Sequence, residues 1–376
     1  MSLSRVQLSN NQQAFLALVR AGLWEKDVQL APFGHIDCNE VYRLAEEQAV
    51  IGLVAAGIEH VKDVKLPKEE VLQFVGQTLQ LEQQNQAMNA FIGKLVDKLR
   101  AAGIYTLLIK GQGVAQCYEK PLWRSCGDVD LFLSDDNYKR TKELLVPIAS
   151  SAEKEYIIEK HLGMTIDGFV VELHGKLYCG LSSKIEKGLD DIKKAVFYEG
   201  KVRSWMNGKT QVFLPNADED AIYVFAHMLQ HFFREGLGLR QICDWCRLLW
   251  TYKDSLNRGL LESRLRKMGL ITEWKAFEAF AVDYLGMPAE AMPFYSHSKK
   301  WSRKSKKICK FVMEVGNMGH NRDNSHFEKP YLARKLYSFG RRCGDLMRHA
   351  YLFPMDSLRF FSAIVFKGLR SAANGE

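Results

Sequence analysis

The sequence contains no long uninterrupted hydrophobic run. A helix that crosses a bilayer needs about 20 consecutive apolar residues, and no stretch of the 376-residue chain approaches that length. The opening MSLSRVQLSNNQQ is too polar for a secretory signal peptide. These absences disfavour an integral membrane protein and a secreted protein, so we expect a cytoplasmic location.

The cysteines lack the density and regular spacing of a disulfide scaffold, and no internal repeat or low-complexity linker is present. Most of the cysteines stand in apolar, helix-like contexts, which favours reduced thiols. They are Cys38, Cys117, Cys126, Cys179, Cys243, Cys246, Cys309 and Cys343.

The charge is distributed unevenly along the chain. The net charge of +8 arises from 52 Lys plus Arg against 44 Asp plus Glu. From Tyr295 to the end there are 17 basic and 6 acidic residues, so the remainder is close to neutral. The basic C-terminus predicts contact with an anionic surface, although no recognised DNA- or RNA-binding motif is present.

The hydrophobic pattern divides the chain into three regions. Residues 1–103 have helical spacing and form a predicted N-terminal helical region. Residues 104–215 alternate short apolar, strand-like runs with helical segments, which predicts an α/β core. Residues 216–376 return to the helical period and end in the basic segment. We therefore expect an α+β protein whose small mixed sheet is flanked by helical regions.

Two carboxylates stand in a predicted strand. Asp128 and Asp130 lie two residues apart, and the period of a strand places both on one face, while Val129 and Leu131 point to the core. Two adjacent like charges are unfavourable unless a cation neutralises them. The pair therefore predicts binding of a divalent cation.

A third carboxylate lies in a later apolar strand. Glu172 is followed by Leu173 and His174, and alternation places Glu172 and His174 on the same face. Three carboxylates on neighbouring strands would form a site for Mg²⁺ or Mn²⁺, which supports phosphoryl and nucleotidyl transfer. We expect Asp128, Asp130 and Glu172 to be the metal ligands and the catalytic residues.

A glycine-containing turn precedes these strands. Lys110, Gly111 and Gly113 lie where a predicted strand passes into a helix, and the glycines allow the backbone to approach a phosphate closely. Arg124 is a further candidate phosphate ligand. We expect these four residues to bind the nucleotide.

Taken together, these motifs resemble the bacterial uncharacterised nucleotidyltransferase family, within the polymerase-β-like superfamily. The resemblance covers about the first two-thirds of the chain, including the N-terminal AEEQAVIGLVAAGI segment. The motifs that carry it are Lys110-Gly111, Tyr118-Glu119-Lys120-Pro121, Arg124, Asp128-Val129-Asp130 and Glu172-Leu173-His174. It implies a polymerase-β-like fold and Mg²⁺-dependent transfer of a nucleoside monophosphate from an NTP to an unknown acceptor.

Two departures from the superfamily pattern stand out. Gln112 follows Gly111 where relatives carry a serine whose hydroxyl helps to hold a phosphate, and Glu172 replaces a more usual aspartate. The first departure keeps open a catalytically inactive nucleotide-binding or regulatory protein of the same fold. A second alternative is a membrane- or nucleic-acid-associated partner protein that uses the basic C-terminus.

Two histidines on a later predicted helix allow two interpretations. His227 and His231 lie four residues apart, on one helix face, and would either line the pocket or tie helices together. Cys243 and Cys246, with these histidines, superficially suggest a zinc site. Because a C-x-x-C inside a continuous helical pattern is typical of core packing, we disfavour zinc there.

Overall fold

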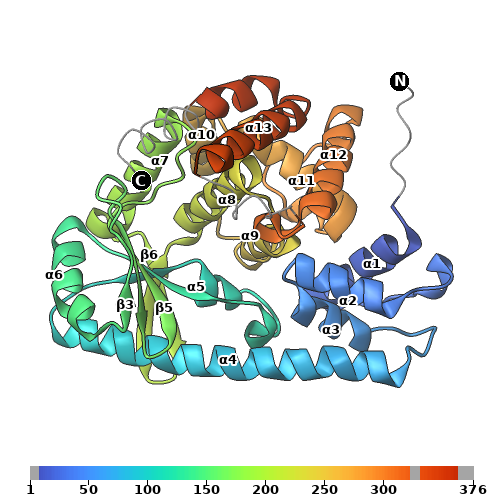
Figure 1. Ribbon diagram of the computed structural model, residues 1–376, viewed down its shortest axis with the longest axis horizontal. Coiled ribbons are helices and arrows are strands. Elements are labelled where there is room, and N and C mark those ends of the chain that lie inside the picture. The colour runs from blue at the N-terminus through green and yellow to red at the C-terminus, as the bar shows by residue number, and fades with distance from the viewer. Residues whose placement is uncertain (1–7, 322–330, 363–376) are drawn as a thin grey trace.

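The computed structural model describes residues 8–321 and 331–362. Over these residues the chain forms a seven-stranded mixed sheet surrounded by helices (Figure 1), and the predicted α+β class is confirmed. The strand order in the sheet is β3-β4-β5-β2-β1-β7-β6. The strands are β1 (Leu107–Ile109), β2 (Asp128–Phe132), β3 (Ser151–Ala152), β4 (His161–Ile166), β5 (Phe169–His174), β6 (Val202–Asn207) and β7 (Thr210–Pro215).

Helices precede the sheet, connect its strands and follow it. Those that precede the first strand or connect strands are α1 (Asn10–Trp24), α2 (Cys38–Glu47), α3 (Ile51–Glu59), α4 (Lys68–Ala101), α5 (Gly111–Ala115), α6 (Asp135–Leu145) and α7 (Ser183–Tyr198). Those that follow the last strand are α8 (Ala217–Arg234), α9 (Leu239–Thr251), α10 (Arg258–Met268), α11 (Ile271–Leu285), α12 (Lys299–Val315) and α13 (Tyr331–Ala350).

The long helix α4 connects the N-terminal helices to the sheet. It runs beneath both in Figure 1. Its apolar residues Phe91, Ile92 and Leu95 join one buried cluster with Val129 and Leu131 of β2. This packing fixes one face of β2 against α4 and leaves the carboxylate-bearing face on the opposite side.

The other face of the sheet packs against α7 and lies toward α8. Phe132 of β2 contacts Phe197 of α7, with ring centroids 4.9 Å apart. On α8, α9 and α11, large aromatic side chains form a buried centre, where Phe225 lies 5.2 Å from Trp245 and 4.7 Å from Trp274 between ring centroids. These contacts set α8 and α9 opposite the polar residues of β2.

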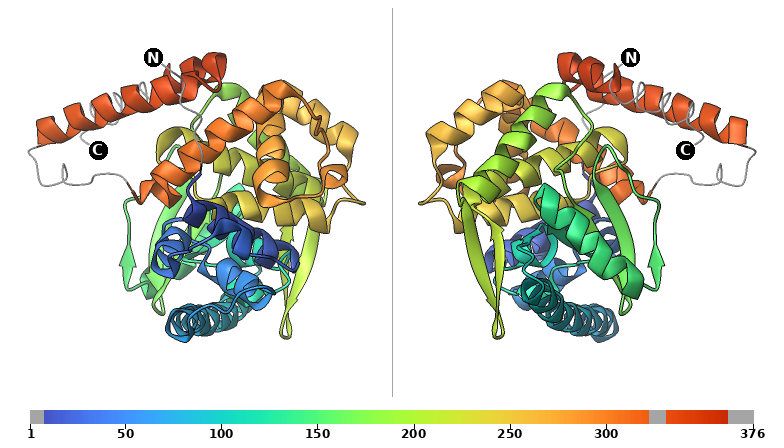
Figure 2. Two further views of the ribbon diagram at one scale, coloured as in Figure 1. Left: turned by 90° about the vertical axis from the view of Figure 1, so that its right-hand side faces the viewer. Right: turned by 90° about the vertical axis from the view of Figure 1, so that its left-hand side faces the viewer.

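Helix α13 lies across the top of the molecule and extends outward at one end (Figure 2). It contacts α8 among its neighbours. Among residues 8–321 and 331–362, no helix combines the length and apolar character that a membrane crossing requires.

Candidate active site

The central strands of the sheet bring three carboxylates together. β2 and β5 are parallel neighbours, and their register places Asp130 directly beside Glu172. Alternation along β2 puts Asp128 on the same face. One oxygen from each of Asp128, Asp130 and Glu172 lies within 4.8 Å of the others, so the structure unites the three carboxylates that the sequence pattern predicts on one face.

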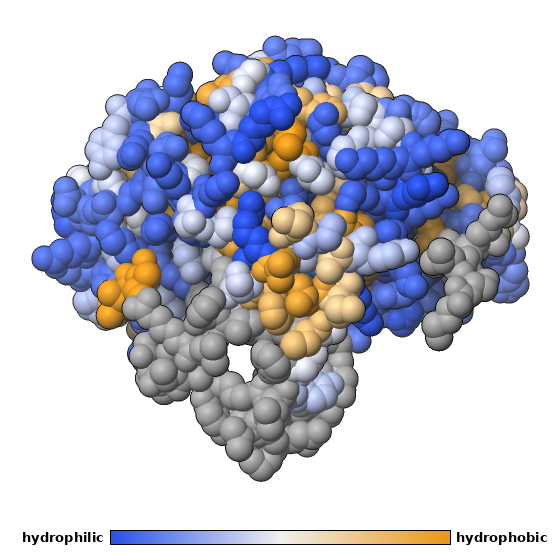
Figure 3. Space-filling view, turned by 90° about the horizontal axis from the view of Figure 1, so that it is seen from above, coloured by the Kyte–Doolittle hydropathy of each residue, from blue (hydrophilic) through white to orange (hydrophobic). Residues whose placement is uncertain are grey.

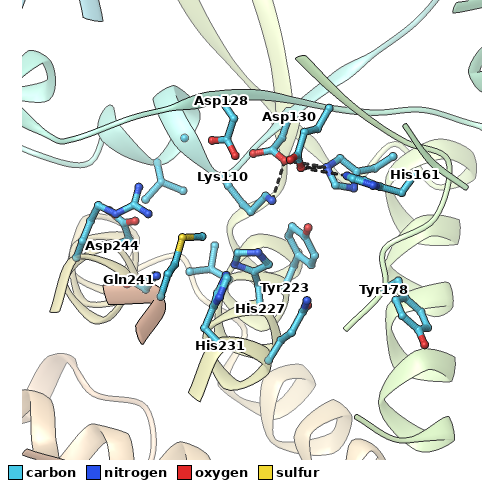
Figure 4. Close-up of a pocket in the computed structure, with 18 of the residues that line it drawn as sticks. Lys110, Asp128, Asp130, His161, Tyr178, Tyr223, His227, His231, Gln241 and Asp244 are labelled. Carbon is cyan, nitrogen blue, oxygen red and sulfur yellow. Dashed lines mark hydrogen bonds and ion pairs between the residues drawn. The ribbon is translucent and has the colours of Figure 1, made fainter. Parts of the chain in front are cut away.

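These carboxylates lie in a cavity of about 330 Å³ between the sheet and helices α8 and α9. Figure 4 shows Asp128, Asp130, Lys110 and His161 on one side of it, with side chains of α8 facing them. Tyr223, His227 and His231 of α8 and Gln241 of α9 line the opposite wall. The arrangement encloses the carboxylates on the side away from α4.

Lys110 supplies a positive charge beside the carboxylates. It follows β1 with φ of 56° and ψ of −146°, a positive-φ conformation that is unfavourable for a side-chain-bearing residue and is often found at functional sites. Its Nζ lies 2.7 Å from Asp130 Oδ1. Burial alone would lower the pKa of Lys110, but the neighbouring carboxylates, Asp130 first, outweigh it and raise that pKa, so the lysine stays charged.

The two predicted turn glycines have different surroundings. Gly111 lines the cavity, and a Cβ there would come 3.3 Å from Cys126 Sγ. Gly113 is not among the residues that line the cavity; a Cβ there would meet Leu214 Cδ2 at 2.7 Å, so this glycine allows α5 to pack on β7. Of these two glycines, only Gly111 can therefore allow the backbone to approach a phosphate in the cavity.

Gln112, at the position of the missing serine, points away from the cavity. It is 1% exposed, and its Nε2 donates to Asn85 Oδ1 at 2.6 Å. Asn85 in turn donates to the carbonyl oxygens of Leu122 and Arg124. Gln112 thus takes part in a buried network that holds the segment before β2 against α4.

The carboxylate of Glu172 accepts hydrogen bonds from two histidines. His161 Nε2 lies 3.2 Å and His174 Nε2 3.4 Å from Glu172 Oε2. Burial alone would raise the pKa of Glu172, but these hydrogen bonds and the charge of Lys110 outweigh it and lower that pKa well below its usual range. Glu172 is therefore ionised and suited to hold a cation.

His174 connects Glu172 to Asp130. Its Nε2 also lies 2.7 Å from Asp130 Oδ1. Burial alone would lower the pKa of His174, but its hydrogen bonds with Asp130 and Glu172 raise it.

Asp128 is the carboxylate with the least compensation. The charge of Asp130, together with burial, raises the pKa of Asp128 above its usual value, and Lys110 offsets only part of this effect. A divalent cation between the three side chains would remove the repulsion, and oxygen ligands are those that Mg²⁺ prefers. The residues present therefore fit a magnesium ion.

Most of the Arg124 guanidinium group takes part in a buried ion pair. Its Nε and Nη2 lie 3.0 and 2.6 Å from the two oxygens of Asp244 on α9. Tyr118 Oη donates to the same carboxylate at 2.8 Å. Among residues 8–321 and 331–362, Nη1 of Arg124 finds no hydrogen-bond partner. The residue lines the cavity, so this donor is available to a ligand.

The wall opposite the carboxylates carries several polar side chains. His227 and His231 both line the cavity, with ring centroids 4.6 Å apart. Burial, with the nearby charge of Lys110, lowers the pKa of His227 well below its usual value, so this imidazole is neutral. Within the part of the chain that the structure describes, the buried atoms of this wall that lack a hydrogen-bond partner include Nε2 of His231, Nε of Arg240 and both amide atoms of Gln241. Such groups fit a polar ligand in the cavity.

Sequence reasoning missed several cavity residues. His161 opens β4, a strand whose pattern is interrupted by Gly163. The sequence signal that indicates this strand is the Asp167-Gly168 dipeptide. These two residues have φ of 50° and 83° and form a two-residue turn between β4 and β5. Tyr223 and Gln241 had no signal beyond their places on helices that flank the site.

The cysteines of α9 lie in the core. Cys243 and Cys246 are completely buried, and burial raises the pKa of both thiols. The groups of potential metal ligands found in the described ranges contain histidine and carboxylate side chains only. Both cysteines therefore contribute packing to α9.

Comparison with known proteins places this site in a family context. A family described as uncharacterised nucleotidyltransferase matches residues 34–284, a span that includes all of the carboxylates and histidines described above. A solved structure that matches is the crystal structure of an antigenic nucleotidyltransferase-like protein from Paracoccidioides brasiliensis, with 13% identity, a TM-score of 0.31 and coverage of 55% of this chain and 92% of that chain. At this low identity and TM-score, the similarity supports no statement about the site. The comparison with curated proteins found no match.

The family match covers well over half of the 376 residues. The resemblance drawn from the motifs around Lys110, Asp128 and Glu172 is thereby confirmed. The chain belongs to the uncharacterised nucleotidyltransferase family.

Proposed function

We propose that this protein transfers a nucleoside monophosphate from an NTP to a small acceptor in a magnesium-dependent reaction. The observation that carries the proposal is the convergence of Asp128, Asp130 and Glu172 within 4.8 Å in a cavity that Lys110 also lines. Three carboxylates and one cationic side chain suit a metal-bound triphosphate. The α/β segment 104–215, which contains the seven described strands, would form the catalytic unit between two helical regions.

Asp128, Asp130 and Glu172 would hold Mg²⁺. When bound there, the ion would neutralise charge on the triphosphate and lower the pKa of an attacking hydroxyl. The lowered pKa of Glu172 makes it a weak base, which favours a ligand role over proton abstraction for this residue. Gly111 and the unpartnered Nη1 of Arg124 would contact phosphate oxygens, and Lys110 would add a positive charge.

The opposite wall would position the acceptor. Gln241 and His231 offer polar atoms that have no partner among the described residues, and Gln241 supplies both a donor and an acceptor. A cavity of about 330 Å³ has room for ligands of small-molecule size. A small molecule, or a single reacting group of a larger molecule, would therefore be the acceptor.

A labelling experiment tests this function. Purified protein is incubated with Mg²⁺ and cell extract, and with NTPs that carry the label on either the α- or the γ-phosphate. We expect the α-label to move to an acceptor and the γ-label to leave as pyrophosphate. Transfer of the γ-label would indicate a kinase instead, and absence of both would contradict the proposal.

The position of Gln112 favours a second candidate, a nucleotide-binding or regulatory protein without turnover. Its side chain is tied to Asn85 rather than turned toward the cavity, so it cannot replace the serine hydroxyl. Under this alternative, NTP would bind in a magnesium-dependent manner and be recovered unchanged.

The basic C-terminal region supports the remaining alternative, contact with an anionic membrane or nucleic acid. Helix α12 carries seven Lys and Arg residues, and Met347, Tyr351, Met355 and Leu358 are more than half exposed. Figure 3 shows a hydrophobic patch among largely hydrophilic residues on the upper face. Residues 322–330 and 363–376 of this region lie outside the described structure, and salt-dependent binding to anionic vesicles or oligonucleotides would test the alternative.

A further inference from the structure

A second cluster of potential metal ligands adjoins the three carboxylates. His161, Glu172 and His174 each offer one ligand atom, and these atoms lie within 4.8 Å of one another. The cluster shares Glu172 with the carboxylate group, and its other two members are imidazoles. Its chemistry therefore differs from that of the all-oxygen site.

The sheet register explains why these side chains meet. β4 and β5 are antiparallel, and His161 is paired directly with His174. Directly opposed residues project from the same face, and Glu172 lies on that face because it stands two residues before His174. The two imidazole centroids are 4.9 Å apart. A regular β-hairpin thus holds all three groups without any special loop.

The distances between the ligand atoms suit a single bound ion. Glu172 Oε2 lies 3.2 Å from His161 Nε2 and 3.4 Å from His174 Nε2. Ligands that each stand about 2.0–2.2 Å from a metal ion are separated from one another by roughly 3.0–3.6 Å in tetrahedral or octahedral geometry. Small side-chain adjustments would therefore complete coordination.

The cluster is accessible from the cavity. All three residues line it, and the side chains of His161 and Glu172 are 22% and 28% exposed, whereas that of His174 is 11% exposed. Lys176 and Tyr178, which follow His174 along the chain, also line this cavity. An ion held by three protein ligands would keep open positions for water or a substrate oxygen.

Two imidazoles and one carboxylate form a ligand set that selects transition metals. Imidazole suits Zn²⁺, Co²⁺, Cu²⁺ and related ions, whereas Mg²⁺ prefers oxygen ligands. His174 Nε2 also lies 2.7 Å from Asp130 Oδ1, and a bound ion would replace this hydrogen bond. Asp130 would retain Lys110 as its partner.

We propose that His161, Glu172 and His174 form a binding site for a divalent transition-metal ion, distinct from the all-oxygen magnesium site but sharing Glu172 with it. This site does not depend on the proposed nucleotidyl transfer, since an ion can bind here whether or not turnover occurs. It gives the cavity one oxygen-rich and one nitrogen-rich position for cations.

Metal binding to the tag-free, full-length chain tests the proposal. Co²⁺ is titrated into metal-free wild-type protein while its visible absorption is recorded, and Zn²⁺ is then added as a competitor. We expect one equivalent of Co²⁺ to bind with the absorption of a histidine-ligated ion and to be displaced by Zn²⁺. His161→Gln should weaken Co²⁺ binding by at least about tenfold, because a ligand is lost.

Two variants separate this site from other places where the probe could bind. His35→Gln changes an exposed histidine and should leave Co²⁺ binding unchanged. Asp128→Asn removes a ligand that belongs only to the carboxylate group, so it should change Co²⁺ affinity by less than about threefold while weakening Mg²⁺ binding. Loss of Co²⁺ binding in Asp128→Asn with retention in His161→Gln would overturn the proposal.

A measurement on the wild-type protein alone covers the case in which His161→Gln does not fold. With one equivalent of Cu²⁺ bound, electron spin-echo modulation by the remote imidazole nitrogens counts the histidine ligands. Two coordinated imidazoles are expected. A count of zero or one, or no stoichiometric binding of Co²⁺ or Cu²⁺, would contradict the site.

Discussion

Lys110 Nζ lies 2.7 Å from Asp130 Oδ1, so a lysine expected to bind phosphate is paired with a carboxylate expected to bind metal. The Asp130 side chain is 1% exposed and that of Lys110 is 15% exposed. In the metal-free protein this lysine therefore supplies the positive charge that compensates the three carboxylates. We expect Mg²⁺ to take over that role and to leave Lys110 able to contact a phosphate.

Replacement of Lys110 tests this relationship. Lys110→Met should lower the free energy of unfolding of the metal-free protein by about 3–5 kcal/mol, since it leaves a buried carboxylate without its partner. Saturating Mg²⁺ should restore about 3 kcal/mol, because binding to the folded state stabilises it. Chemical denaturation with EDTA or with Mg²⁺ measures both effects.

The matched control is Lys187→Met, which changes an exposed lysine on α7. It should alter the free energy of unfolding by less than about 0.5 kcal/mol in either condition. If Lys110→Met behaves like this control, the lysine does not compensate the carboxylates.

Asp128→Asn should stabilise the metal-free protein at neutral pH and abolish transfer. The raised pKa of Asp128 means that its neutral form favours folding; this contribution is complete below its ordinary pKa of 3.8 and is lost as the pH rises through the higher folded-state pKa. In EDTA, the variant should lack this loss of stability as the pH rises above the ordinary pKa of the carboxyl. Turnover with Mg²⁺ should fall on the order of 10³-fold, since metal binding contributes several kcal/mol.

A variant with full turnover would remove Asp128 from the catalytic residues. By contrast, Asp130→Asn should destabilise the metal-free protein, because Asp130 contacts both Lys110 and His174. The two aspartates therefore differ in their effect on stability while sharing an effect on activity.

A double-mutant cycle distinguishes the structural role of Arg124 from phosphate binding. Arg124→Met and Asp244→Leu should each cost about 3–5 kcal/mol of stability, since each leaves one buried charge unpaired. The loss of stability in the double variant should be smaller than the sum of the two single losses by more than about 1 kcal/mol. An Arg124→Met protein of unchanged stability that binds NTP weakly would assign the residue to phosphate binding alone.

Glu278 on α11 should make stability depend on pH away from the site. Burial raises the pKa of this fully buried carboxyl to about 7, and its hydrogen bonds from Phe294 N and Trp274 Nε1 only partly oppose that effect. The contribution of this group to the free energy of unfolding should be greatest below about pH 4.5. It should fall by about 3 kcal/mol as the pH rises through 7. Glu278→Gln should remove this slope, which denaturation at several pH values would detect.

The corresponding change at an exposed position, Glu143→Gln on α6, should keep the wild-type slope. An unchanged slope in Glu278→Gln would mean that the carboxyl does not titrate in this range.

Much of the central sheet could be predicted because local pattern and structure agree there. The strand predicted to carry Asp128 and Asp130 corresponds to β2. The predicted N-terminal helical region, residues 1–103, closes with α4, which ends at Ala101 and is followed by Gly103 with φ of 67°. The later apolar strand predicted to carry Glu172 and His174 corresponds to β5, Phe169–His174. Alternation of apolar residues is strong in these segments, since one face of each is buried.

Other strands escaped prediction because their pairing depends on the sheet. β6 and β7 are partly exposed and form a hairpin around Gly208, which has φ of 61°. The Asn207-Gly208 dipeptide was the available signal. At the site, the sequence pattern predicts that Lys110 contacts phosphate, but it does not reveal that Lys110 forms an ion pair with Asp130.

The most direct test of the account is a crystal structure of the protein with Mn²⁺ and a non-hydrolysable NTP analogue. Manganese substitutes for magnesium at oxygen ligands, and its anomalous scattering marks its position. We expect a manganese peak about 2.0–2.3 Å from one oxygen each of Asp128, Asp130 and Glu172, with the triphosphate in the same cavity beside Lys110. A peak elsewhere, or a triphosphate bound outside this cavity while Lys110 keeps its ion pair with Asp130, would contradict it.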